Sequence, residues 1–471
     1  MLRPAITALS VLLIAAPALS ARAQEGAPPE EAHAAAHDAP LEPGERREVP
    51  DYDGRPEVDT TDAGDVALWI PRVLFSPLYL VTEFVIRRPL GFLVTELERA
   101  DAFIWLYDFL TFGPDRQAGI FPLALYEFGF SPSVGLYAYW ERFLIDENRI
   151  SIRGSTWGAD WLSGSISDRL RPTDYTLVTA RFAALKRPDQ IFRGIGWAAT
   201  RGVRSRYQLE QIDGSLRFGL RPWRRSTIDY EVGYRSASFA NSRWDNDPGV
   251  VDTGQIPPGF FTGYNALRFG AALVLDTREI RELMTGGVRV GAFVQQSVGF
   301  GGIPRSPWVT WGGSATLATD VLGHGRVLSV TGEVALITPF DDDDPRVVVP
   351  FTELIDASGE GPLKGFWPGE IRGQSVAALG VSYLWPIWVW ADAYVRLTVG
   401  NAFGEHLQDF ELERLRLSFD LGVRPRVDGE ATFEILVGFG TEAFVDGTDL
   451  AGVRFAVGTR SDILCLDRYC Y

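Results

Sequence analysis

The chain has 471 residues and a formal net charge of −16. An acidic chain is repelled by the phosphate backbone of DNA and RNA, so we exclude nucleic acid as a partner. No nucleophile-elbow, zinc-protease or dithiol motif occurs, and the histidines His324 and His406 fall in predicted loops. We therefore expect no enzyme, no metal and no cofactor.

Residues 1–23 have the three regions of a secretory signal peptide. Arg3 supplies the positive charge, Ala5 to Leu19 form the apolar region, and Ala21-Arg22-Ala23 gives the cleavage pattern. The apolar region is short for a membrane-spanning helix, which disfavours a retained anchor. We expect an exported protein.

Residues 24–65 are rich in Ala, Pro, Glu and Gly and nearly lack large apolar side chains. Such a segment cannot bury enough surface to fold, so we predict a disordered linker. His33 and His37 lie four residues apart there, and we interpret them as a solvated pair rather than a metal site.

Residues 66–115 are strongly apolar, but Pro71, Pro77 and Pro89 interrupt the run. Because proline ends or kinks a helix, we predict two or three short amphipathic helices and no single span. Trp69 and Trp105 are typical of a membrane interface, and packing as an ordinary helical core is the alternative. The segment is therefore either interfacial or periplasmic.

From about Ile120 to the end, apolar residues alternate with polar ones. In Ala391–Gly400 the odd positions are apolar and the even ones include Asp392, Arg396 and Thr398. A soluble β-sandwich or a membrane β-barrel could produce this pattern. Strands of about 9–12 residues, aromatic strand ends and the export signal favour the barrel.

We predict a transmembrane β-barrel of about 16 antiparallel strands occupying residues 116–471. The predicted strands are Val134–Phe143, Arg149–Trp157, Trp161–Asp168, Tyr175–Leu185, Ile191–Thr200, Tyr207–Leu220, Thr227–Phe239, Ala266–Asp276, Val288–Val298, Trp308–Thr319, Val327–Thr338, Ser375–Trp385, Trp390–Asn401, Leu412–Val423, Thr432–Gly440 and Val453–Gly458. The inward-facing charges Arg396, Arg414, Arg416, Asp420 and Glu434 suit a water-filled lumen.

The two cysteines, Cys465 and Cys470, stand close together at the C-terminus. In an exported protein such a pair is typical of a small disulfide ring. The acidic run Asp341–Arg346 is interpreted as a hydrated loop rather than a calcium site.

A long connection, from about Pro339 to Gln374, joins the eleventh and twelfth predicted strands. Its segment Gly361–Ser375 (GPLKGFWPGEIRGQS) and the strand after it closely resemble the D15 surface-antigen barrel of the Omp85 superfamily, which includes the BamA and TamA relatives. In that family the sixth extracellular loop folds back into the lumen through an Arg-Gly-Phe/Tyr tip. The resemblance places the tip at Lys364, Gly365 and Phe366 and the loop's return at Glu370, Arg372 and Gly373.

This chain departs from the family at both ends of the expected ion pair. Lys364 replaces the usual arginine, and Thr398 stands where the family usually has an inward aspartate. The bidentate arginine–carboxylate clamp therefore cannot form as such. We name Arg396, Thr398 and Asp420 as candidate lumen partners of the tip.

The family's insertases carry periplasmic POTRA domains, and residues 24–115 show no pattern of one. The resemblance implies a barrel in the bacterial outer membrane that assists protein insertion or translocation through a seam between its first and last strands. The segments "VGLYAYW" and "GVRFAVG" are the predicted seam. A loop-plugged pore, or a lipid-handling or structural barrel, is the alternative. The expected partners are outer-membrane lipids, and unfolded outer-membrane proteins or a periplasmic accessory protein.

Overall fold

The structure is a computed structural model that describes residues 102–223, 225–278, 286–300, 307–321, 325–340, 349–388, 391–425 and 431–461. The predicted signal peptide, the linker, most of the helical segment 66–115 and the acidic run Asp341–Arg346 lie outside these residues. Cys465 and Cys470 lie outside them too, so the predicted disulfide stays a prediction.

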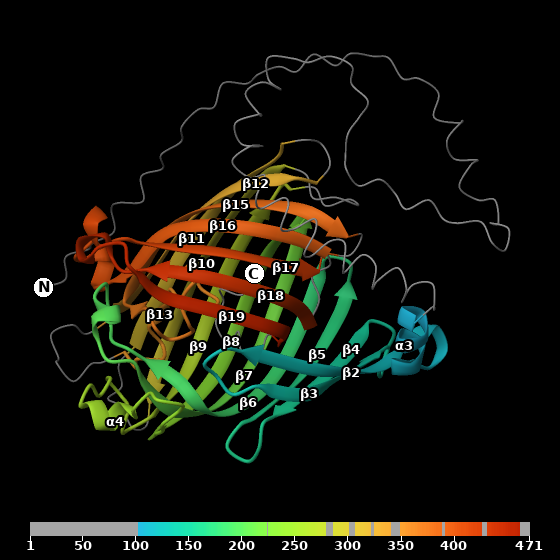
Figure 1. Cartoon of the computed structure of the whole chain (residues 1–471). Helices are drawn as coiled ribbons and strands as arrows, with labels where there is room; N and C mark the ends of the chain where they lie inside the picture. Colours follow the sequence, from blue (N-terminus) through green and yellow to red (C-terminus); the bar gives the residue numbers. More distant parts are fainter. Residues whose placement is uncertain are drawn as a thin grey trace, which may run out of the picture. The chain divides into compact units, whose positions relative to one another are not determined.

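Sixteen antiparallel strands close into a barrel, which confirms the predicted fold class (Figure 1). The sheet has 17 strands, of which the two-residue β1 (Thr111–Phe112) pairs beside β2 and adds nothing to the ring. The barrel strands are β2 Ala118–Glu127, β3 Ser133–Glu141, β4 Asn148–Thr156, β5 Leu162–Thr173, β6 Thr176–Phe192, β7 Ser205–Trp223, β8 Ser226–Asn241, β9 Tyr264–Asp276, β10 Gly287–Phe300, β11 Pro307–Asp320, β12 Val327–Pro339, β15 Ser375–Trp388, β16 Ala391–Phe403, β17 Arg416–Pro425, β18 Ala431–Thr441 and β19 Leu450–Ser461.

The alternation of side chains along each strand separates a lipid-facing surface from the lumen. On β10, Val288, Val290 and Val294 are exposed on the outside, whereas Gln295 and Ser297 are buried on the inside. Successive residues of a strand point to opposite faces, so an apolar row and a polar row follow directly from the sequence. An exterior of this kind suits a bilayer, in agreement with the expected outer-membrane location.

Two errors in the predicted strands cancel in the count. The prediction missed β2, which contains Pro122, and it assigned Ile191–Thr200 as a strand of its own. In the structure, Ile191 and Phe192 end the long strand β6, and a loop with the 3₁₀ turn Ala199–Arg201 follows. A register shift between Arg187 and Gln190, beside Pro188, interrupts the alternation and divides β6 in the sequence.

Helices are few in the described part of the chain. The helix α3 (Ala102–Leu110) lies within the predicted helical segment, and Trp105 stacks on Phe109 on its exposed surface. The other helix, α4 (Val250–Thr253), is a single turn. Short 3₁₀ turns occupy Pro114–Arg116, Glu405–Leu407, Leu412–Arg414 and Phe444–Asp446. No helix of the described residues is long and apolar enough to cross a membrane.

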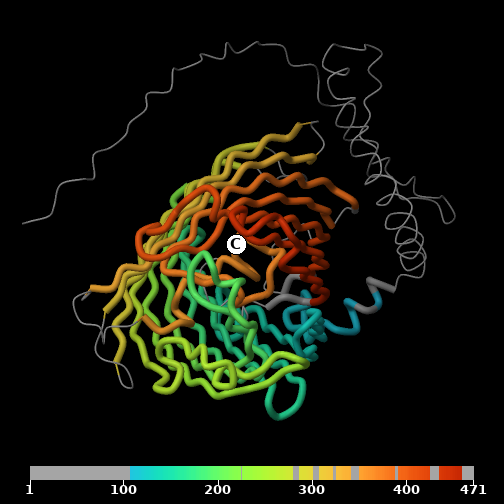
Figure 2. Tube along the Cα trace, turned by 60° about the vertical axis from the view of Figure 1, so that its left-hand side comes forward, coloured from blue at the N-terminus to red at the C-terminus, as the bar shows by residue number. Residues whose placement is uncertain are grey.

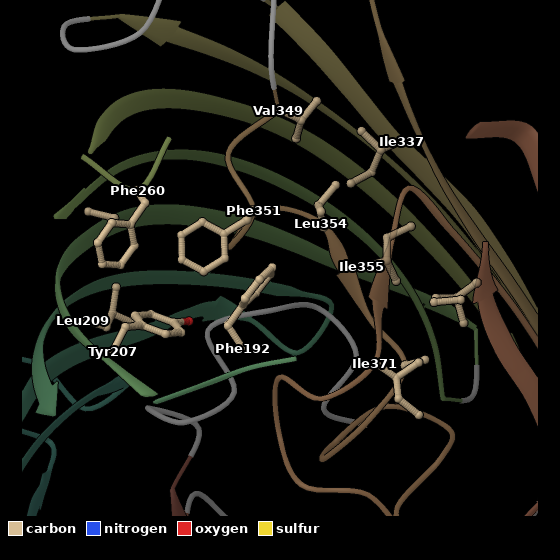
Figure 3. Packing of buried hydrophobic residues seen from close by; sticks show 14 of the residues in the cluster. Phe192, Tyr207, Leu209, Phe260, Ile337, Val349, Phe351, Leu354, Ile355 and Ile371 are labelled. Carbon is tan, nitrogen blue, oxygen red and sulfur yellow. The ribbon is translucent and has the colours of Figure 1, made fainter. Parts of the chain in front are cut away.

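The hydrophobic core of the protein lies inside the barrel. The connection from β12 to β15 folds back into the lumen, where the orange tube lies within the ring of strands (Figure 2). Phe351 packs edge-on against Tyr207 and Phe192, with ring centroids 5.1 Å and 5.7 Å away (Figure 3). The short strands β13 (Ile355–Asp356) and β14 (Arg372–Gly373) pair within this connection, so the loop has a fold of its own.

Candidate functional site

The lumenal loop, residues 349–374, has a tip that touches the last strands of the barrel. The backbone N–H of Gly365 donates a hydrogen bond of 2.8 Å to Ser418 Oγ on β17. A Cβ added at Gly365 would lie 2.3 Å from the carbonyl oxygen of Phe439 on β18. Only glycine lets the loop backbone come this close to the strand backbone.

Phe366 fills a depression made by glycines, which we call the glycine socket: Gly440 of β18 and Gly452 of β19. A Cβ added at Gly440 would lie 2.3 Å from the Phe366 ring, and one at Gly452 would lie 3.0 Å from it. Phe366 is fully buried, and the Arg416 guanidinium stands 5.5 Å from its ring centroid. The tip is therefore anchored to the two strands that end the barrel.

Lys364 forms an ion pair with Glu434 of β18, at 3.8 Å between Nζ and Oε1. The Tyr394 hydroxyl donates a 2.7 Å hydrogen bond to the same carboxylate oxygen. Glu434 was expected to face the lumen but was not among the predicted partners of the tip. The structure thus adds Glu434 to the residues that pair with the tip, and Arg396, Thr398 and Asp420 stay predicted partners.

The predicted lumen partners lie beside the tip and pair with one another. Arg396 Nε donates a 3.0 Å hydrogen bond to Asp420 Oδ1 between β16 and β17. Thr398 is buried directly across from Ser418, the residue that receives the hydrogen bond from Gly365. Thr398 therefore lies across from the residue that accepts the hydrogen bond of the tip.

The returning part of the loop, Glu370 to Gly373, is buried, and ion pairs hold it in place. Glu370 accepts a 3.0 Å hydrogen bond from the Trp367 N–H and lies 3.4 Å from Arg193. Arg372 lies 3.5 Å from Asp356, its register partner in the two-stranded ladder. Gly373 passes close to β16, since a Cβ there would lie 2.6 Å from the Phe403 carbonyl oxygen.

Burial raises the pKa of both loop carboxyls, Glu370 and Asp356. For Glu370 the loss of solvent outweighs the opposing effect of Arg193. For Asp356 it outweighs Arg372 and the hydrogen bonds from Ser358 and Gly369. The docked loop therefore favours protonation of these two carboxyls.

The barrel closes where β19 meets β2, and this junction is short. Three register pairs join the two strands: Ala456 with Glu127, Val457 with Tyr126, and Gly458 with Leu125. In the described part of the barrel, every other junction between neighbouring strands has at least six register pairs. The junction of β17 with β18 has six. We call the β2–β19 junction the seam.

The seam ends at a glycine because the two backbones meet there. Gly458 has a φ of +147°, and a Cβ at this position would lie 2.2 Å from the Ala124 carbonyl oxygen. The prediction placed "GVRFAVG" in the seam, and this segment does lie in β19. Its partner was predicted wrongly: "VGLYAYW" lies in β3, and β2 forms the seam because it precedes β3 in the ring.

A buried arginine connects the seam to the loop. Arg454 of β19 pairs with Glu127 of β2 at 2.6 Å and with Glu360 of the loop at 2.9 Å. It also donates a hydrogen bond to the Gly359 carbonyl oxygen. We call these four residues the Arg454 latch. The sequence analysis did not single them out, although an arginine at an inward position of the last strand was a visible signal.

The sequence matches no protein-family model and no curated protein. Similarity appears among solved structures. BamA from Haemophilus ducreyi, lacking POTRA domains 1–3, gives a TM-score of 0.52 at 13% identity, over 73% of this chain and 70% of that chain. CdiB from Escherichia coli gives a TM-score of 0.49 at 12% identity, over 74% of this chain and 63% of that chain. CdiB from Acinetobacter baumannii gives a TM-score of 0.46 at 13% identity, over 73% of this chain and 60% of that chain.

The similarity to BamA is a similarity of fold. This chain has a ring of sixteen strands with a loop folded into it. The chain therefore has a β-barrel fold similar to that of BamA, in agreement with the fold class that its strand pattern predicted.

Proposed function

We propose that this barrel assists the insertion or translocation of outer-membrane proteins through the seam between β2 and β19. The observation that supports this most is the short junction, three register pairs against six or more elsewhere in the described ring. Opening this junction separates fewer register pairs than opening any other junction of the described barrel.

The edge of β2 offers hydrogen bonds to an incoming strand. Its register with β19 ends at Leu125, and β1 pairs only with Ala118 and Gly119. Ile120–Leu123 therefore have no ladder partner on this edge among the described residues. Pro122 is typical of an edge strand, since it has no N–H to donate. An unfolded outer-membrane protein could add a strand here by β-augmentation.

Opening of the seam is coupled to the loop in this proposal. Arg454 holds β2, β19 and the loop together, so parting the strands also breaks its pair with Glu127. The loop in turn fills the lumen with apolar residues, including Phe351 and Leu354. Binding of a client protein at the seam would therefore affect the loop through the buried guanidinium of Arg454.

A disulfide across the seam tests the proposal. Tyr126→Cys with Val457→Cys joins register partners of β2 and β19, in a chain whose own cysteines are changed to serine. The matched control, Val294→Cys with Trp311→Cys, joins exposed register partners of β10 and β11. The rate at which liposomes holding each protein fold an unfolded outer-membrane barrel is followed by protease protection.

We expect the oxidised seam variant to lose the acceleration and to regain it on reduction, while the control stays active in both states. Equal acceleration from the oxidised and reduced seam variants would exclude a role for the seam. No acceleration by the unmodified protein over empty liposomes would favour the alternative, a loop-plugged pore or a lipid-handling or structural barrel.

A further inference from the structure

Two short segments expose large apolar side chains at one end of the barrel. The helix α3 lies at the end where β2 begins, and the β3–β4 turn, residues 142–147, lies at the same end because β3 runs antiparallel to β2 (Figure 1). The residues concerned are Trp105 and Phe109 of α3 and Phe143, Leu144 and Ile145 of the turn. Phe109 is 71% exposed and Leu144 is 79% exposed. A turn surrounded by water is normally polar, so an apolar turn indicates a different surrounding.

The lipid-facing surface of the barrel continues into both segments. Phe112 of β1 lies opposite Ala118 of β2, which lies opposite Trp140 of β3, so the three share one face of the sheet. Phe112 and Trp140 are exposed on that face, as the outward side chains of the barrel are. Phe109 lies in the last turn of α3, directly before β1, and Phe143 packs edge-on against Trp140 with ring centroids 5.7 Å apart. The apolar outer surface therefore extends past the strand ends on both sides of β2.

The opposite face of α3 fastens the helix to the barrel. The Tyr107 ring lies 6.1 Å from the ring of Phe121 on β2, between centroids, and the Thr111 hydroxyl donates a 2.7 Å hydrogen bond to the Tyr107 carbonyl oxygen. A residue two positions away lies about 200° around a helix, so Trp105 and Phe109 both face away from Tyr107. Their rings stack with centroids 5.5 Å apart. The helix therefore presents a stacked aromatic pair on the side that does not contact β2.

Charged side chains lie among these apolar ones and indicate the depth at which the segments sit. Arg116 pairs with Asp108 of α3 at 2.6 Å, and Arg142 of the turn pairs with Asp115 at 3.7 Å. All four side chains are at least half exposed. Charged groups are costly in the hydrocarbon core, whereas exposed aromatic rings and leucine are unfavourable in bulk water. The headgroup region of a bilayer accommodates both kinds of side chain.

We propose that α3 and the β3–β4 turn together form a lipid anchor, which binds the headgroup region of the leaflet at this end of the barrel. Lipid is the occupant because the exposed rings of both segments continue the row of Phe112 and Trp140 on the lipid-facing surface. Since β1 joins α3 to the edge of β2, the anchor holds the headgroup level beside the seam. The proposal does not depend on opening of the seam, because the anchor is exposed while the seam is closed.

Fluorescence quenching by labelled lipids tests this. A fluorophore is attached to a single cysteine in the full chain, whose own cysteines are changed to serine. The test sites are Phe109→Cys and Leu144→Cys, and both side chains are exposed, so the barrel should still fold. Val294→Cys, an outward site in the middle of β10, is the control for the hydrocarbon core, and Arg243→Cys, just after β8, is the control for water. Each protein is placed in phosphatidylcholine liposomes whose lipids carry a nitroxide quencher near the headgroup end or near the methyl end of the acyl chain.

We expect the nitroxide near the headgroup to quench both test labels about twofold more strongly than the nitroxide near the methyl end. The label at Val294 should show the reverse order, and neither lipid should quench the label at Arg243. Should a label at Phe109 disturb α3, Trp105→Cys on the same face repeats the measurement. Test labels that neither lipid quenches would mean that water or protein surrounds the segments, and this would overturn the proposal. Quenching in only one of the two segments would overturn it as well, because the anchor requires both.

Discussion

Arg454 of β19 and Glu127 of β2 form a buried ion pair across the seam, with 2.6 Å between Nε and Oε1. Both side chains are almost inaccessible to solvent, and Glu360 of the loop approaches the same guanidinium. Taking one charge from such a group leaves the others buried without compensation. The closure of the barrel and the docking of its loop therefore depend on a common residue.

Replacing Arg454 with methionine should destabilise the barrel by about 3–5 kcal/mol, because Glu127 would lose its buried partner. The midpoint of urea unfolding in detergent measures this. Adding Glu127→Gln should restore part of the loss, since the orphaned charge is then gone. A methionine variant as stable as the wild type would show that the pair does not hold the seam. Arg243→Met, at an exposed pair, is the control and should change stability little.

Gly365→Ala should prevent the tip from docking, because the new Cβ would overlap the Phe439 carbonyl. An undocked loop leaves the lumen open, so we expect the conductance of a planar bilayer containing the variant to rise. Gly404→Ala is the matched control, since its nearest neighbour, Gln408 Cβ, would be 3.5 Å away. Equal conductance of both variants and the wild type would mean that the tip tolerates a side chain.

Phe366→Ala should cost about 3–5 kcal/mol by emptying the glycine socket. The measurement is the thermal midpoint of the barrel, followed by circular dichroism. Phe340→Ala removes an exposed phenylalanine at the end of β12 and should have a small effect. If the two substitutions lower the midpoint equally, the socket contributes no special stability.

Docking of the loop should be more stable in mild acid than at neutral pH. The pKa of Glu370 in the folded protein lies above its ordinary value of 4.5, so the folded state keeps a proton that the unfolded state has lost. Stability therefore falls as the pH rises from 4.5 through the raised pKa, and returns as the pH is lowered. Asp356 acts in the same direction.

Proteolysis of the loop at a series of pH values measures this dependence. Glu370→Gln cannot titrate, and its amide oxygen can still accept the Trp367 N–H, so the variant should show a smaller dependence than the wild type. Glu411→Gln, at an exposed pair with Arg414, is the control. Identical pH profiles for wild type and Glu370→Gln would contradict the role given to burial.

The sequence by itself determined the class of fold and the lipid-facing surface. Alternation is a local property, since neighbouring side chains of a strand point to opposite faces whatever the strand pairs with. The loop motif around Gly365 was also visible, because glycine there follows from a close approach of two backbones. The bounds of β2 and β6 could not be predicted from the sequence, because Pro122 and Pro188 interrupt the alternation of apolar and polar residues there.

Only the tertiary structure decided which strands form the seam and which charges meet in the lumen. Glu127 and Arg454 are 327 residues apart in the chain and meet only because the ring closes. Lys364 pairs with Glu434 for the same reason. Pairing between distant residues depends on the register of every strand between them, and no local pattern in the sequence contains it.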